Sequence, residues 1–412
     1  MTSWKTYRAE DYCLTVTDGT HDSPKPQVEG RYLITSKHLK PSGIDFSSAN
    51  KICEYDYQKI IQRSKVEQYD ILFSMIGTIG TIHRVTMPTI DFAVKNMGIF
   101  KMGGDADKSF WMYYWLQSPI AQEYIQSRIT GSTQGYLTLG NLRDFPVCVP
   151  PLKEQLRIAG ILGAIDDKIE NNRRINANLE LQAQALYKQW FVDFEFPNED
   201  GKPYKSSGGK MVDSELGQIP EWWSVGTIYK YVNVVYGAPY KSALFNERKD
   251  GNPLIRIRDL KTFSPQYYTQ EILPNTEFIN AGDVIAGMDA EFVPCLWMGE
   301  KGVLNQRCCK FASKQDSISN YYVMFLVKPE LEFVQSYKTG TTVSHLGKAD
   351  IDKFVVIQPP LIVIEEFSRI ADALLYNKVK LAKENITLAT LRDTLLPKLM
   401  NGEMSVGDVS VD

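Results

Sequence analysis

The stretch that decides the fold occurs twice. Residues 139–154 are LGNLRDFPVCVPPLKE and residues 346–365 are LGKADIDKFVVIQPPLIVIE. Each copy has Leu-Gly, then Phe, then Pro-Pro-Leu, and then a long run with helical periodicity. The copies lie about 210 residues apart, whereas solenoid repeats have periods of roughly 20–50 residues. The repeated unit is therefore half of the molecule, a globular domain followed by a long helix.

Other landmarks keep the same order in both halves, and Trp4 and Trp223 open them. The matched segments are Leu33–Lys40 with Leu254–Lys261, Asp70–Met75 with Asp283–Met288, Gly131–Tyr136 with Gly340–His345, and Arg157–Ala159 with Arg369–Ala371. So many matches in one order indicate a duplication. They predict a pseudo-two-fold arrangement of the two halves.

The run after each Pro-Pro pair predicts a long helix with a coiled-coil seam. A Pro-Pro pair is not accommodated inside a helix, so Pro150-Pro151 marks the start of the first one. The apolar seam, with residues recurring every seven, is Ile158, Leu162, Ile165, Ile169, Leu179 and Leu186 in the first helix and Phe367, Leu374, Leu381, Leu388 and Leu395 in the second. Asn172 and Asn176 interrupt it. A single seam facing water is unfavourable, so we expect the two helices to pack on each other. A two-fold axis relating the two halves would make that pair antiparallel.

The remaining patterns predict a mixed α/β fold. Short β-rich runs such as Tyr32–Thr35, Ile71–Ile76 and Leu254–Ile257 alternate with turns, and a helix is expected near Ser109–Ile129. The expected domains are a globular domain at 1–150, a spacer helix at 151–195, a linker at 196–220, a second globular domain at 221–360, a second spacer helix at 361–404 and a flexible tail at 405–412.

Composition narrows the class of protein. The net charge is −3, so any DNA footprint is local or shared with a more basic partner. No run of 18 apolar residues exists, which argues against a membrane helix. Six scattered cysteines and four histidines favour reduced thiols in the cytoplasm over a disulfide framework or a metal site. Neither a P-loop nor GxSxG nor HExxH occurs, so no catalytic residue is predicted.

Polar residues in turns and strand ends are the candidate ligand contacts. Arg256 and Arg258 lie two apart in a β-like run, which would place both on one face. A guanidinium can bind guanine bidentately or clamp a phosphate, and a glutamine can pair with adenine. The candidates for contacting DNA are His21, Lys25, Thr35, Lys37, Lys40, Gln134, Tyr136, Tyr240, Lys241, Arg256, Arg258, Lys261 and His345. The alternative is that these are ordinary solvated strands and tight turns. Trp190, Phe191 and Phe194 are expected to pack rather than to form a cofactor site.

The chain resembles the specificity (S) subunit of type I restriction–modification systems over essentially its whole length. The resemblance rests on the duplicated layout, on Pro-Pro-Leu followed by Glu and Arg-Ile-Ala in each half, and on three segments. These are Asp18–His21, Ser214–Trp223 and Leu395–Glu403. Trp222 stands where a glycine is usual in the family.

The resemblance implies that each globular domain is a target-recognition domain for one half of a split double-stranded DNA sequence. The helices would set the unread gap and dock two methyltransferase subunits, which bind S-adenosylmethionine and methylate adenine. Restriction subunits that use ATP and Mg would join them, while this chain would hold no cofactor. Because the candidate residues differ between the halves, we expect an asymmetric target. The alternatives are a degenerate specificity subunit and a coiled-coil scaffold that binds only protein; a restriction–methylation fusion would need catalytic motifs in this chain.

Overall fold

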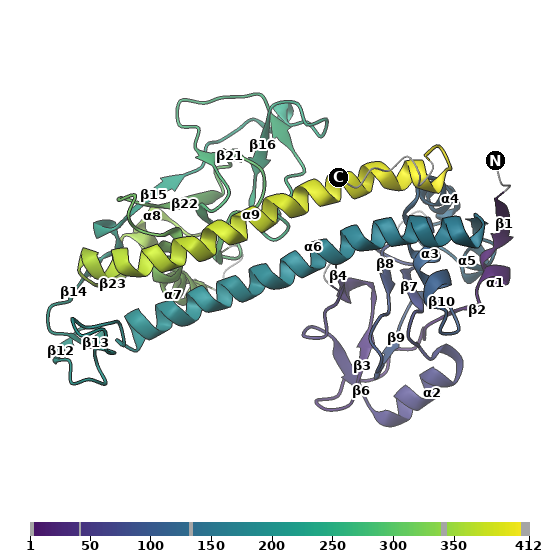
Figure 1. The fold of residues 1–412 in the computed structure, drawn as a ribbon, viewed down its shortest axis with the longest axis horizontal. Coiled ribbons are helices and arrows are strands. Elements are labelled where there is room, and N and C mark those ends of the chain that lie inside the picture. Colours follow the sequence, from purple (N-terminus) through teal and green to yellow (C-terminus); the bar gives the residue numbers. More distant parts are fainter. Residues whose placement is uncertain (1–3, 41–42, 132–134, 339–343, 405–412) are drawn as a thin grey trace. The chain divides into compact units, whose positions relative to one another are not determined.

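The computed structural model describes residues 4–40, 43–131, 135–338 and 344–404. It confirms a mixed α/β chain (Figure 1), which divides into two compact units. Unit 1 contains Met1–Glu170 and Leu388–Asp412, and unit 2 contains Asn171–Thr387. Both long helices, α6 (Leu152–Tyr187) and α9 (Leu361–Met400), contribute residues to both units.

Unit 1 is built on a four-stranded antiparallel sheet in the order β2-β10-β7-β8, beside a small sheet in which β3 pairs parallel with β9. Strand β1 pairs antiparallel with β11. The strands are β1 (Lys5–Arg8), β2 (Thr15–Asp18), β3 (Arg31–Ile34), β4 (Leu39–Lys40), β5 (Gly43–Ile44), β6 (Asn50–Ile52), β7 (Ile71–Ser74), β8 (Ile82–Arg84), β9 (Phe92–Val94), β10 (Met97–Lys101) and β11 (Pro146–Val149). The helices are α1 (Ala9–Tyr12), 3₁₀ turn η1 (Ser36–His38), α2 (Glu54–Ser64), α3 (Ala106–Gln117), α4 (Pro119–Arg128) and α5 (Leu139–Arg143).

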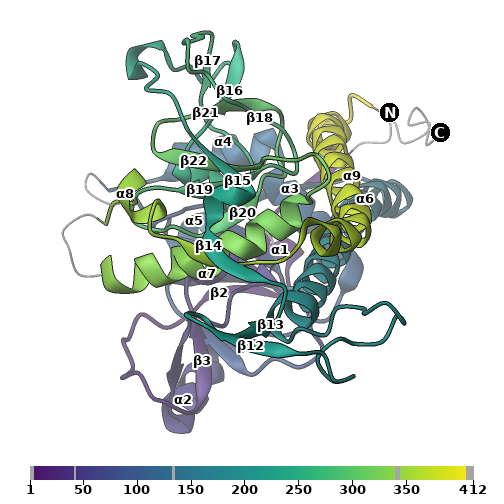
Figure 2. The same cartoon turned by 90° about the vertical axis from the view of Figure 1, so that its left-hand side faces the viewer.

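Unit 2 repeats this topology. Its main sheet has the order β15-β22-β19-β20, its small sheet pairs β16 parallel with β21, and β14 pairs with β23. The strands are β12 (Met211–Ser214), β13 (Gly217–Pro220), β14 (Ser224–Thr227), β15 (Val232–Tyr236), β16 (Asn252–Ile255), β17 (Tyr268–Thr269), β18 (Phe278–Ile279), β19 (Val284–Gly287), β20 (Pro294–Leu296), β21 (Gly302–Leu304), β22 (Cys308–Ser313) and β23 (Val355–Gln358). The helices are η2 (Lys188–Val192), η3 (Ile228–Lys230), η4 (Ser242–Leu244), η5 (Ile257–Leu260), α7 (Asn320–Lys338) and α8 (Lys348–Ile351). Helix α7 packs against β19, β20 and β22 (Figure 2).

One close approach explains a glycine that both units share. The main chain after β2 bridges to Lys95 through Thr20, and the chain after β15 bridges to Asn305 through Ala238. A Cβ on Gly19 would lie 2.3 Å from the Val94 carbonyl oxygen, and a Cβ on Gly237 would lie 2.1 Å from that of Asn305. Only glycine permits this approach, so the duplication seen in the sequence extends to a backbone contact.

The two long helices contact each other within each unit. In unit 1, an Arg392 terminal nitrogen lies 2.8 Å from the Asp166 carboxylate. In unit 2, Asn172 Nδ2 donates to Asn385 Oδ1 at 2.9 Å, and Asn176 Nδ2 donates to the Lys378 carbonyl at 3.2 Å. As the residue number rises in α6 it falls in α9, so the helices are antiparallel there.

The predicted seam residues differ in burial. Ile158, Leu162, Ile165, Ile169 and Leu395 lie in the unit 1 core, and Phe367 lies in the unit 2 core. Leu388 packs against the first core, Leu186 and Leu374 pack against the second, and Leu179 and Leu381 are half-buried. Trp190, Phe191 and Phe194 are buried in unit 2, as expected from the sequence.

Three local predictions were wrong or incomplete. The strand expected at Leu254–Ile257 ends at Ile255. The helix expected at Ser109–Ile129 is two helices, because Ser118 caps α4 through its hydroxyl and Pro119 follows at the first helical position. The segment expected as a linker contains the β12–β13 hairpin. No helix among the described residues is long and apolar enough to cross a bilayer.

Candidate nucleic-acid interface

The turn after β2 holds an oriented histidine. His21 Nε2 lies 2.8 Å from Asp18 Oδ2, and His21 Nδ1 lies 3.0 Å from Asn96 Oδ1. The other Asp18 oxygen is 3.1 Å from a terminal nitrogen of Arg63, on α2. The Asp18 side chain is 8% exposed whereas that of His21 is 61% exposed. Asp18 and Asn96 therefore hold both ring nitrogens of His21 and fix the direction of an imidazole that is otherwise exposed.

A cavity of about 230 Å³ lies beside this histidine. Its lining combines Asp18, His21, Asn96, Tyr136 and Thr138 with the apolar side chains of Met75, Ile76, Leu137 and Leu139. Tyr136 is held by main-chain bridges to Ile76 and Thr130. The structure thus brings together His21 and Tyr136, two candidates that are far apart in the sequence, and adds Asn96, which the sequence analysis missed. Gln134 lies outside the described residues.

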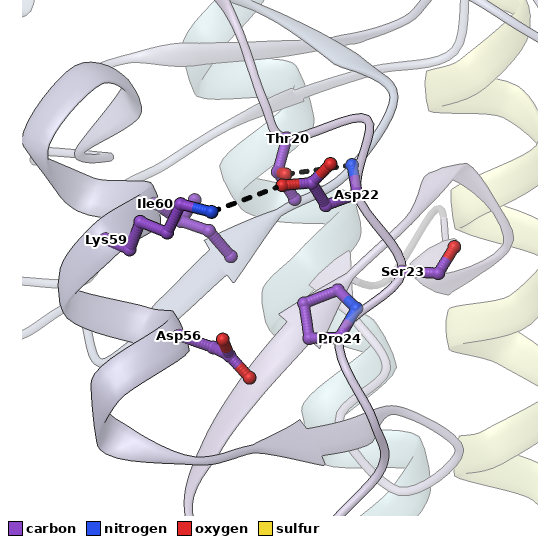
Figure 3. Close-up of a pocket in the computed structure, with 7 residues that line it drawn as sticks. All are labelled: Thr20, Asp22, Ser23, Pro24, Asp56, Lys59 and Ile60. Carbon is purple, nitrogen blue, oxygen red and sulfur yellow. Dashed lines mark hydrogen bonds and ion pairs between the residues drawn. The ribbon is translucent and has the colours of Figure 1, made fainter.

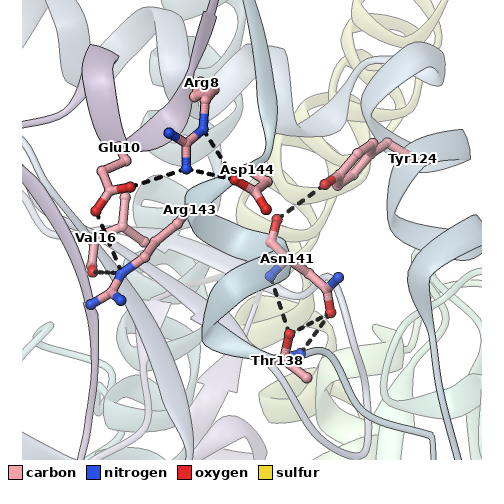
Figure 4. A network of polar contacts seen from close by, with 8 residues as sticks. All are labelled: Arg8, Glu10, Val16, Tyr124, Thr138, Asn141, Arg143 and Asp144. Carbon is pink, nitrogen blue, oxygen red and sulfur yellow. Dashed lines mark hydrogen bonds and ion pairs between the residues drawn. The ribbon is translucent and has the colours of Figure 1, made fainter.

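Polar contacts around α5 hold the Tyr136–Leu139 edge of the cavity in place (Figure 4). The Asn141 N–H donates to Thr138 Oγ1 at 3.1 Å, which caps α5. At the other end of α5, Asp144 Oδ1 lies 2.6 Å from a terminal nitrogen of Arg8. Arg143 Nε donates to the Val16 carbonyl of β2 at 3.2 Å. These contacts join α5 to β1 and β2 and therefore fix the loop that precedes it.

A smaller cavity of about 120 Å³ lies between the turn and α2 (Figure 3). It is lined by Thr20, Asp22, Ser23, Pro24, Asp56, Lys59 and Ile60. Lys59 Nζ is 3.7 Å from Asp22 Oδ2, and Asp56 adds a second carboxylate. Two carboxylates and one ammonium do not favour a phosphate. Lys25, a candidate for DNA contact, is exposed just beyond this cavity.

A short 3₁₀ turn follows the parallel strand of each unit. The Thr35 N–H donates to His38 Nδ1 at 2.9 Å, and the Arg256 N–H donates to Asp259 Oδ2 at 3.0 Å. Burial lowers the pKa of His38, which keeps its ring neutral and able to accept this hydrogen bond. Lys37 and Lys40 are exposed, and Thr35 is half-buried.

The prediction that Arg256 and Arg258 share one strand face was wrong. The Asp259 carboxylate takes the Arg256 N–H, which ends the strand and starts η5. Arg256 is 19% exposed, with its guanidinium 4.3 Å from the Tyr267 ring centroid and Nε 3.3 Å from Asp259. Arg258 is exposed. Arg256 thus packs on its own unit, while Arg258 is free to reach a ligand.

In unit 2 the polar loops meet around the segment after β19. Asp289 Oδ1 is 2.7 Å from His345 Nδ1, and Asp289 Oδ2 is 3.4 Å from Arg307 Nε. Lys261 Nζ is 2.6 Å from Glu291 in the same loop. The structure therefore brings the candidates Lys261 and His345 to one loop. Arg307 had no signal in the sequence, because nothing marked its loop as adjacent to the others.

The remaining two candidates lie in the turn after β15. Tyr240 is buried, and its hydroxyl lies 3.0 Å from Thr276 Oγ1. Lys241 is exposed, and its N–H donates to Glu271. Tyr240 therefore packs inside the unit and holds the turn in place, whereas Lys241 lies on the surface of the turn.

Comparison with known proteins gives concordant results. The family model described as "Type I restriction modification DNA specificity domain" matches residues 26–181 and 223–389. The chain is 27% identical over 325 residues to the type I restriction enzyme MjaIX specificity subunit of Methanocaldococcus jannaschii, which is 74% of this chain and 71% of that protein. It is 27% identical over 213 residues to the EcoBI specificity subunit of Escherichia coli, 50% of this chain and 45% of that one. The crystal structure of a type I system S subunit from M. genitalium has the same fold, with a TM-score of 0.54 at 14% identity over 97% of this chain and 96% of that one.

Proposed function

The chain belongs to the type I restriction–modification DNA specificity family, and we propose on that premise that it selects the DNA target of a methyltransferase complex. Each unit binds one half of a bipartite sequence. One observation supports this most strongly. The two units share a topology, yet the polar cluster of unit 1 is formed by Asp18, His21 and Asn96, and that of unit 2 by Asp289, Arg307 and His345, which lie partly on other loops. A common scaffold with different polar groups suits two different half-sites.

In this proposal the chain contributes recognition and its partners contribute chemistry. Two methyltransferase subunits carry S-adenosylmethionine, and restriction subunits carry ATP and Mg. The two helices form a coiled-coil spacer that fixes the gap and presents docking surfaces. Large apolar side chains exposed on both helices support docking, and they include Leu181 on α6 and Ile370 and Tyr376 on α9. The units correspond to the recognition domains, with the candidate residues named above as their DNA contacts.

Methylation mapping tests this function. The chain is co-expressed with the methyltransferase subunit encoded beside it, and methyladenine is located by long-read sequencing. We expect a new motif of two unlike short halves around a fixed gap. The methyltransferase alone is the control and should give no such motif. A soluble complex that yields no new motif would favour a degenerate subunit or a protein scaffold.

A second prediction concerns the gap. Deleting one heptad from each helix, residues 173–179 and 378–384, removes about 10 Å of helix. We expect the gap to shorten by about three base pairs at 3.4 Å each, with both half-sites unchanged. A deletion in α6 alone is the control, because it misaligns the seam and should abolish methylation. An altered half-site in the double deletion would show that the helices do not set the gap.

A further inference from the structure

In each unit, the loops that hold candidate DNA contacts meet at another loop. That loop was not identified from the sequence as part of the site. This loop joins the last strand of the small sheet to the main sheet, at 95–96 in unit 1 and 305–307 in unit 2. The Asn96 N–H donates to the Thr20 carbonyl, and the Gln306 N–H donates to the Ala238 carbonyl. Asn96 and Gln306 are therefore equivalent, and unit 2 has one additional residue there, Arg307.

Arg307 is held in a fixed position. Its carbonyl oxygen accepts the Met288 N–H at 2.8 Å. Its Nε lies 3.4 Å from Asp289 Oδ2, while the other oxygen of that carboxylate lies 2.7 Å from His345 Nδ1. The Arg307 side chain is nevertheless 56% exposed. An ion pair on the Nε side thus favours one direction of the guanidinium, and its two terminal nitrogens have no partner among the described residues.

We propose that Arg307 is a specificity-determining residue that binds a guanine in the half-site of unit 2. This rests on the proposed function. Two parallel N–H donors match the O6 and N7 acceptors of guanine in the major groove, and their fixed direction gives selectivity. The Asp289 carboxylate also offsets the charge of Arg307. A near-neutral pair has little attraction for a phosphate but keeps its hydrogen-bonding geometry.

Two other arginines of unit 2 provide the contrast. Arg256 is stacked on Tyr267, its Nε donates to Asp259, and its side chain is only 19% exposed, so little of its guanidinium can reach a ligand. Arg258 is exposed, and it has no ion-pair or hydrogen-bond partner among the residues that the structure describes. A cationic side chain that no neighbouring group orients contributes its charge but no fixed hydrogen-bond direction, which suits a contact to a phosphate. Arg258 is therefore the matched control.

The experiment compares wild-type chain with Arg307→Gln, Arg307→Lys and Arg258→Gln, each in complex with the methyltransferase. Methylation motifs are mapped, and DNA affinity is measured against salt concentration. In Arg307→Gln we expect one G·C position in one half-site to become degenerate, with discrimination there falling roughly ten- to a hundredfold. The other half-site stays unchanged. Arg307→Lys keeps the charge and the pairing with Asp289 but lacks the fork, so it should lose discrimination at the same position.

Arg258→Gln should weaken binding to all sequences alike, lower the salt dependence by about one phosphate contact and leave the motif intact. The inference is overturned if both Arg307 variants keep the wild-type motif and lose affinity uniformly, as Arg258→Gln does. It is also overturned if neither half of the wild-type motif contains a G·C pair. These outcomes differ from failure of the proposed function, in which wild-type chain yields no bipartite motif at all.

Discussion

Replacing Lys101 with methionine is expected to lower the free energy of unfolding of unit 1 by about 3–5 kcal/mol at pH 8. The Asp70 side chain is 0% exposed, and its Oδ2 lies 2.7 Å from Lys101 Nζ. The ammonium also donates to the Lys65 carbonyl and to Glu67. Methionine keeps most of the apolar stem of the lysine but leaves Asp70 as a buried carboxylate with no cation.

The same variant should show a defined pH dependence. Burial raises the pKa of Asp70, and Lys101 opposes that shift. The pKa of Asp70 in the folded protein therefore lies above its value of about 3.9 in the unfolded chain. The contribution of Asp70 to stability is largest at a pH below the unfolded pKa and is lost as the pH rises through the folded pKa. Removing Lys101 raises the folded pKa further. The deficit of Lys101→Met relative to wild type should therefore shrink as the pH falls from 8 to 5.

Peptide-resolved amide hydrogen exchange at pH 5 and pH 8 measures the difference in the free energy of unfolding between the variant and wild type. Peptides from β7 and β10 report on unit 1. The double variant Asp70→Asn/Lys101→Met is the control, because it has no buried charge and should recover most of the lost stability. A deficit that is equal at pH 5 and pH 8, or that persists in the double variant, would contradict the explanation.

The second large effect is expected at Phe367, where alanine should cost unit 2 about 3–5 kcal/mol. Phe367 is fully buried. Its ring centroid lies 5.1 Å from that of Phe191, 6.0 Å from Tyr187 and 6.1 Å from Trp190. Truncation would remove the ring that joins α9 to the end of α6, and a cavity would remain in the aromatic core.

Peptide-resolved hydrogen exchange again locates the change. Protection in β19 and β22 should fall in Phe367→Ala, while β7 and β10 of unit 1 should keep theirs. The control is Tyr376→Ala on the same helix, where the side chain is 70% exposed and truncation should cost under 0.5 kcal/mol, roughly the limit for surface substitutions. Equal effects of the two variants would contradict the packing role of Phe367, because alanine favours a helix more than phenylalanine or tyrosine does.

The sequence allowed the duplicated layout and some strands, such as β3 and β7, to be predicted, because heptad spacing and alternation are local signals. It did not reveal where β16 ends. The strand ends where it does because the Arg256 N–H donates to the Asp259 side chain instead of to a neighbouring strand. It also did not reveal the burial of Asp18, which depends on Arg63, 45 residues away. Arg307 could be found only once the bridge between Ala238 and Asn305 was known.

Unit 1 is not continuous along the chain, and this affects how the protein is made. Its core includes Ile158 and Leu162 near the end of the first segment, and Leu395 and Leu399 from α9. About 220 residues separate the two segments, which a ribosome takes roughly 10–40 s to translate at typical rates. The domain begun first is thus completed last. The apolar side chains that pack on Leu395 and Leu399 lack these partners throughout the synthesis of unit 2, so chaperone dependence during translation should be greatest for the N-terminal half.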